Sequence, residues 1–181
     1  MPELIEYMKK NNFFESPAST RFHGNYPGGL AEHSWNVYEM YDTLCNIFVC
    51  DVPRESRIIC GILHDLCKIN QYIPIEKKYE WNKGNPKGHA TLSVQRIKQF
   101  IELTPFEELT ILHHMGVYGS SEWNTQSWQH PEYSLKAVME VFHGNNKAFL
   151  FYIADHLCAA FKEKTAEQKE AEKNEFETKN I

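Results

Sequence analysis

The feature that most constrains this sequence is a polar doublet, His64-Asp65, inside an otherwise apolar segment from Arg57 to Ile69. The apolar residues of this segment recur at helical spacing, which predicts a helix that faces the core. A carboxylate in such a place is unfavourable by several kcal/mol unless something pairs with it. We therefore expect a cation beside Asp65, and the neighbouring imidazole of His64 suggests a metal ion.

Composition sets the broad class. The chain has 181 residues, of which 42% are hydrophobic, enough for one globular domain with a sizeable core. No apolar run approaches the roughly 20 residues that span a membrane, and the acidic N-terminus lacks a signal-peptide pattern. Five cysteines without a CxxC pair indicate reduced thiols in a cytoplasmic protein. The net charge of −5 disfavours long nucleic acid as a partner but allows a small anionic substrate held by a metal. Nothing in the sequence specifies an oligomeric state.

Periodicity and turn formers divide the chain into short helices. An irregular segment over 13–29 contains Arg21 and His23, and it is either an active-site wall or a connector packed by its aromatic residues. The loop from Val117 to Pro131 carries two tryptophans, Trp123 and Trp128, and is placed to cover a site. We expect helices over 2–12, 30–49, 53–68, 88–103, 105–115, 132–142 and 145–161, and a small hairpin over 71–83.

The last twenty residues differ in composition from the rest of the chain. Lysine and glutamate dominate from 162 to 181, which predicts a solvated helix or a frayed tail. We therefore expect one domain over 1–161, including the N-terminal helix, followed by a charged tail over 162–181. An interaction arm is the alternative interpretation of this tail.

Further residues fit a shared cation. Asp155 lies inside another apolar helix, and His33 offers a nitrogen ligand from a third. With His64 and Asp65 they form a mixed nitrogen and oxygen site with positions left for water and substrate. Three histidines at predicted helix ends form a second set, with Asp65 able to bridge two metals. These are His89, His113 and His114.

Each of these residues also has a structural interpretation that involves no metal. His33 alone would most often be a hydrogen-bonded core residue, and His113-His114 alone suits a helix C-terminus. Asp155 alone would cap a helix or pair with an arginine. The order H, HD, H, HH, D over five helices favours the metal interpretation. Lys68 shares the face of the doublet, at i+3 from Asp65, where an ammonium suits a phosphate oxygen. Alternatively, Lys68 merely ends a helix.

These motifs resemble the HD-domain metal-dependent phosphohydrolases. The family pattern H…HD…D corresponds to His33, His64-Asp65 and Asp155, and the stretch Ile62 to Lys68 resembles its HDxxK segment. Residues 17–33 are similar to the entry of the HD domain in bacterial 3′→5′ exoribonucleases, although this chain has no room for their OB domain. Stand-alone HD proteins of bacteria and phages are also similar. The GYP motif of cyclic-di-GMP phosphodiesterases is missing after His114. Gly29 stands where three-metal members have a glutamate, so at most two metals are expected.

The resemblance implies an all-α fold, a single bundle of about six or seven helices with an interior metal site. It implies hydrolysis of a phosphate ester, of a nucleotide or short oligonucleotide, by metal-activated water. Asp65 and Lys68 would be catalytic, and Lys68, Arg21 and His23 would contact substrate. Mixed ligation favours one or two ions of Mn, Fe, Ni, Co or Zn, with Mg possible. Two alternatives are a di-iron HD-domain oxygenase and a non-catalytic, metal-stabilised interaction module.

Overall fold

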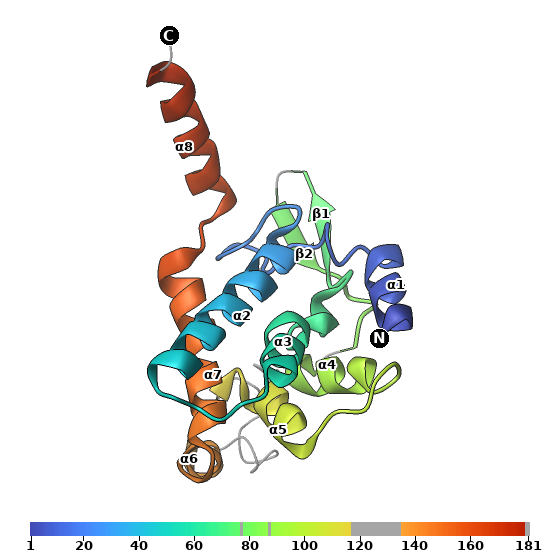
Figure 1. Ribbon diagram of the computed structural model, residues 1–181. Coiled ribbons are helices and arrows are strands. Elements are labelled where there is room, and N and C mark those ends of the chain that lie inside the picture. Colours follow the sequence, from blue (N-terminus) through green and yellow to red (C-terminus); the bar gives the residue numbers. More distant parts are fainter. Residues whose placement is uncertain (77, 87, 117–134, 180–181) are drawn as a thin grey trace.

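The computed structural model describes residues 1–76, 78–86, 88–116 and 135–179 (Figure 1). Within these ranges the chain forms eight α-helices and one two-stranded sheet, which confirms the all-α prediction. The helices are α1 (Pro2–Lys10), α2 (Gly29–Ile47), α3 (Arg54–Leu63), α4 (His89–Ile97), α5 (Pro105–His113), α6 (Leu135–Gly144), α7 (Asn146–Leu157) and α8 (Ala166–Lys179). No helix within the described ranges is long and apolar enough to cross a membrane. The predicted loop with Trp123 and Trp128 lies outside the described residues.

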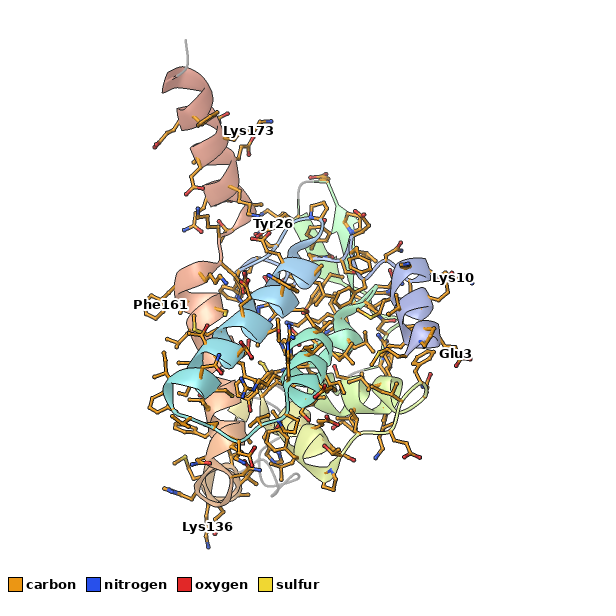
Figure 2. All side chains as sticks on the ribbon, viewed as in Figure 1. Glu3, Lys10, Tyr26, Lys136, Phe161 and Lys173 are labelled. Atoms are coloured by element: carbon orange, nitrogen blue, oxygen red, sulfur yellow. The ribbon has the colours of Figure 1, made fainter. Side chains whose placement is uncertain are left out.

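The body is a bundle built around α2. This helix packs against α3 on one side and α7 on the other, and α5 contacts α3, α4 and α7 (Figure 1). The largest buried side chains include Tyr41 of α2 and Phe151 of α7, whose rings meet edge to face at 5.0 Å. Side chains fill the interior between these helices (Figure 2), so the core lies where the bundle helices face one another.

Local sequence signals place several element ends. Thr104 caps α5 in a capping box: Glu107 N donates to Thr104 Oγ1, and Thr104 N donates to Glu107 Oε2. Pro105 occupies the first turn of α5, where the helix predicted over 105–115 begins. The predicted hairpin is also confirmed, with β1 (Tyr72–Ile75) paired antiparallel to β2 (Lys78–Trp81). All five cysteines are free thiols.

The junction before α2 depends on glycine. Gly24 and Gly28 have positive φ values of 59° and 83°, which L side chains rarely adopt. A Cβ on Gly29 would lie 2.0 Å from Gly24 O, so the chain at this turn passes over itself too closely for any side chain. This turn sets the start of α2, four residues before His33.

The C-terminal region differs from a simple charged tail. A π-helical turn, η4 (Cys158–Lys162), follows α7 directly, and α8 then extends away from the body (Figure 1). The base of α8 is tethered: Lys169 pairs with Glu32 at 2.6 Å, and its ammonium lies over the ring of Tyr26. Tyr26 itself is labelled near the base of α8 in Figure 2. Residues beyond Phe161 therefore contact the body before α8 leaves it.

Candidate metal centre

Five helices bring six polar side chains to one buried place. His33 comes from α2, and Asp155 from α7. His89 begins α4, His114 follows the end of α5, and the doublet follows the end of α3. All six are less than a tenth exposed except His89, whose side chain is 12% exposed. The structure thus brings together the two predicted sets of ligands, except for His113.

The His64-Asp65 doublet lies in a break between two helical segments and not inside a helix. The helix predicted over 53–68 is therefore wrong at its C-terminal end. Helix α3 ends at Leu63, and a short 3-10 turn, η1 (Leu66–Lys68), follows Asp65. Tertiary hydrogen bonds stabilise this break: Cys67 N donates to Ser93 Oγ, and the Arg96 guanidinium donates to the carbonyls of residues 66 and 67. The apolar periodicity continues because the residues of the turn remain buried.

The two carboxylate oxygens of Asp65 face different neighbours. Oδ2 lies 3.4 Å from His33 Nε2, 3.5 Å from His64 Nε2 and 2.7 Å from Lys68 Nζ. Oδ1 lies 2.8 Å from His89 Nε2 and 3.5 Å from His114 Nε2. Oδ1 has no hydrogen bond of good geometry within the described ranges, despite the short distance to His89. This division is what a carboxylate that bridges two ions requires.

Contacts at Nδ1, the ring nitrogen on the side away from the cluster, fix the orientation of His64 and His114. His64 Nδ1 lies 2.9 Å from Gly61 O, and His114 Nδ1 lies 2.6 Å from Ile111 O. A carbonyl only accepts, so each Nδ1 carries a proton, which leaves Nε2 as the nitrogen that can offer a lone pair to a metal. These lone pairs point inward, where His64 Nε2 lies 3.2 Å from His33 Nε2. Such second partners are typical of metal-ligating histidines.

Protonation supports the same arrangement. Burial lowers the pKa of His64 to about 3, which keeps its ring neutral. Burial would raise the pKa of Asp65, but Lys68 and the neighbouring imidazoles hold it well below its usual range. Burial would also lower the pKa of His33, but the surrounding carboxylates, Asp155 first among them, raise it well above its usual value. The ionised acids and the neutral ring of His64 are in the form that metals bind, whereas a metal would displace the extra proton that the carboxylates favour on His33.

The donor set therefore fits a divalent ion. His33, His64 and Asp65 offer ligand atoms within 4.8 Å of one another, and so do His64, His114 and Asp155. Mixed imidazole and carboxylate donors suit first-row transition metals, while Mg²⁺ prefers oxygen. An ion among these inward nitrogens would also satisfy Asp65 Oδ1.

Other predicted site residues divide into two groups. Lys68 lies in the site, buried and paired with Asp65, whose charge outweighs burial and raises the pKa of the ammonium. His23 is half-buried, with its ring 5.0 Å from that of His33, so it is nearer the centre than an ordinary surface histidine. Arg21 is exposed and lies over the Phe22 ring, and none of its described contacts reaches the cluster.

His113 is the one predicted ligand that the structure places elsewhere. Its Nδ1 lies 2.9 Å from Leu109 O, and none of the ligand clusters within the described ranges contains it. Adjacent residues on a helix point in different directions, and of these two only His114 belongs to a described ligand cluster, with its Nε2 3.5 Å from Asp65 Oδ1. We therefore retain His114 and leave His113 out of the ligand set.

Two further residues were not singled out from the sequence. Glu163, just after η4, has both carboxylate oxygens within 3.0 Å of His33 Nδ1. Cys67 Sγ lies 3.0 Å from His89 Nδ1. Glu163 belongs to a lysine and glutamate run that predicts a solvated tail, so the sequence carries no local signal for it. Cys67 resembles any buried thiol of an apolar segment.

Comparison with known proteins identifies the family. Residues 30–160, well over half of the chain, match the family described as HD domain. The chain belongs to the HD-domain family. This confirms the resemblance seen in His33, His64-Asp65 and Asp155. This chain is also similar to a protein of Geobacillus sp. (strain WCH70), the 3'-5' exoribonuclease YhaM, with 31% identity over 127 residues. That similarity covers 67% of this chain but only 38% of the relative. No solved structure matches.

Proposed function

We propose that this HD domain is a metal-dependent phosphohydrolase that cleaves a phosphate ester of a nucleotide or short oligonucleotide. The observation that carries the proposal is the buried cluster around Asp65, whose two oxygens face separate histidine pairs. Family membership supports the chemistry, and the similarity to a 3'-5' exoribonuclease supports a substrate with nucleotide character.

The ligand set divides into two parts around Asp65. His33, His64, Asp65 and Asp155 would hold one ion, and Asp65, His89 and His114 a second. When bound, such ions supply Lewis acidity to the phosphate and lower the pKa of a water toward neutrality. Manganese, iron, nickel, cobalt and zinc fit these donors, and magnesium fits less well.

Other residues would position the substrate. Lys68 Nζ is fixed beside Asp65 Oδ2 at 2.7 Å, so its ammonium can also attract a phosphate oxygen and stabilise charge that develops there. His23, half-buried beside His33, is placed to contact the remainder of the substrate. Its pKa is lowered to about 4, chiefly by burial, so its ring is neutral at pH 7 and acts as a hydrogen-bonding group.

The experiment is a screen of phosphomonoesters, cyclic nucleotides and short oligonucleotides against Mn²⁺, Mg²⁺, Ni²⁺ and Fe²⁺. We expect hydrolysis with at least one transition metal, its loss together with bound metal in Asp65→Ala, and reduced turnover with bound metal in Lys68→Ala. His156→Ala is the matched control, because His156 is exposed on α7 and its described contacts, a hydrogen bond and a ring contact with Tyr152, do not involve the metal cluster. No turnover of any phosphoester, or oxygen consumption by an iron-loaded chain, would contradict the proposal.

A further inference from the structure

The outer nitrogen of His33 has an unusual partner. His64 and His114 donate to carbonyls three residues earlier, whereas His33 Nδ1 faces the carboxylate of Glu163, 130 residues further along the chain, at 2.9 and 3.0 Å. We propose that Glu163 is the positioning residue for His33, and that the segment after η4 is thereby part of the metal centre. This inference rests on the metal centre proposed above. Glu163 lies beyond residue 160, where the match to the HD-domain family ends.

Burial shows that this contact is not an incidental surface pair. The side chains of Glu163 and His33 are 0% and 2% exposed. A carboxylate removed from water is unfavourable by several kcal/mol unless it is hydrogen-bonded and paired. Hydrogen bonding to His33 lowers the pKa of Glu163 although burial would raise it, so this acid is ionised against the ring.

The geometry makes Glu163 a positioning residue and not a further ligand. Its oxygens face Nδ1, while the inward cluster of Asp65, Asp155 and His64 faces Nε2 on the other side of the ring. A carboxylate at Nδ1 keeps the proton there, leaves the lone pair at Nε2, and makes that nitrogen a stronger donor to a metal. The ring is thus held by contacts on both of its nitrogens.

The backbone around Glu163 explains how a residue outside the bundle is held in place. Glu163 N donates to Cys158 O at 3.0 Å across the π-helical turn. Lys164 O accepts a hydrogen bond from Gly24 N at 3.0 Å, and Ala166 N donates to Asn25 Oδ1 at 2.7 Å. These bonds join the segment that carries Glu163 to the loop that leads into α2. Helix α2 carries His33, so both residues are held by elements attached to the same loop.

The test compares Glu163→Ala and Glu163→Gln with a matched control, Glu39→Gln. Glu39 pairs with Lys162 at 2.9 Å on the surface of the same junction, so the control removes a charge there without touching His33. Binding of Mn²⁺ to the metal-free chain is measured by calorimetry. We expect Glu163→Ala to weaken binding about 10- to 100-fold, Glu163→Gln to weaken it less because its amide oxygen still accepts from Nδ1, and the control to bind as the wild type does.

A second readout reports on the ring itself and does not depend on turnover. In the Zn²⁺-loaded wild type, the Nδ1 proton of His33 should exchange slowly and give a downfield NMR signal, assigned by its loss in His33→Asn. Glu163→Ala should lose this signal while the far-UV circular dichroism of the metal-free chain is unchanged.

The outcomes separate this inference from the proposed function. Wild-type Mn²⁺ affinity in Glu163→Ala, a retained ring signal, an equal loss in Glu39→Gln, or a wild type that binds no divalent metal would each overturn the role of Glu163. Binding that depends on Glu163 in a chain that cleaves no phosphoester would support the positioning role and contradict the proposed function.

Discussion

The pairing of Asp65 with Lys68 allows a quantitative test in the metal-free chain. Oδ2 and Nζ lie 2.7 Å apart, and the two side chains are 1% and 10% exposed. Asp65→Asn preserves the shape but leaves the ammonium buried without this counter-charge. Breaking a buried ion pair by removing one partner costs about 3–5 kcal/mol. We expect a loss near the lower end of that range, because Asp155 also favours the charged form of Lys68.

The reciprocal and double variants complete a cycle. Lys68→Met should cost less than Asp65→Asn, because His33 can carry a proton beside the remaining carboxylate. The double variant contains neither charge, so its loss of stability should be smaller than the sum of the two single losses by about 0.5–3 kcal/mol, the range of couplings between residues in contact.

The assay is urea unfolding followed by far-UV circular dichroism in EDTA at pH 7. The matched control is the exposed pair Lys98–Glu108, which has a similar separation of 2.8 Å but side chains that are 48% and 34% exposed. Its single variants should change the free energy of unfolding by less than about 1 kcal/mol. If the losses of Asp65→Asn and Lys68→Met simply add in the double variant, the reasoning from burial and pairing is refuted.

Three further outcomes are expected. His114→Ala should lower the number of Mn²⁺ ions bound per chain in elemental analysis, whereas His113→Ala should leave it unchanged, and equal losses would contradict the assignment. Burial lowers the pKa of His64 to about 3, below the value near 6.5 of an unfolded histidine. The unfolded chain therefore binds the extra proton as the pH falls below 6.5, and His64 alone should cost the metal-free protein about 2 kcal/mol between pH 7 and pH 5. The raised pKa of His33 acts in the opposite direction and offsets part of this loss. A urea midpoint in EDTA that does not fall toward pH 5 would oppose this account. Gly61→Ala should lower the free energy of unfolding by about 1–3 kcal/mol through overpacking, because the α2 backbone at Tyr38 lies 2.6 Å from where the new Cβ would stand. An unchanged free energy of unfolding would show that α2 moves freely.

Most of the centre was predictable because its residues violate the pattern of their surroundings. Asp65 and Asp155 are acids in apolar segments, and both are buried as that pattern predicts. His33 could be interpreted as a metal ligand only together with these two acids, because a lone histidine in a helix is as readily a hydrogen-bonded core residue. The choice between His113 and His114 depends on the rotation of α5 about its axis, which tertiary packing decides.

The remaining features have no local sequence signal. The break after Leu63 is stabilised by Ser93 and Arg96, which lie on another helix, while the apolar period continues through it. Glu163 looks like one of several glutamates in a charged run, and only its side-chain burial distinguishes it. Such residues depend on contacts between segments distant in sequence, which periodicity and composition do not encode.

The charges of the metal centre bear on how an acidic protein would attract the anionic substrate proposed above. Within the described ranges the centre contains three carboxylates with buried side chains, Asp65, Asp155 and Glu163, and one buried ammonium, Lys68, which together give a net charge of −2 when the imidazoles are neutral. Buried charge without compensation is unfavourable, and protonation of His33, whose pKa is raised, reduces it in the metal-free chain. One divalent ion would neutralise the centre fully and displace that proton. A second would make the centre positive, so it would bind an anionic phosphate despite the chain's overall charge of −5.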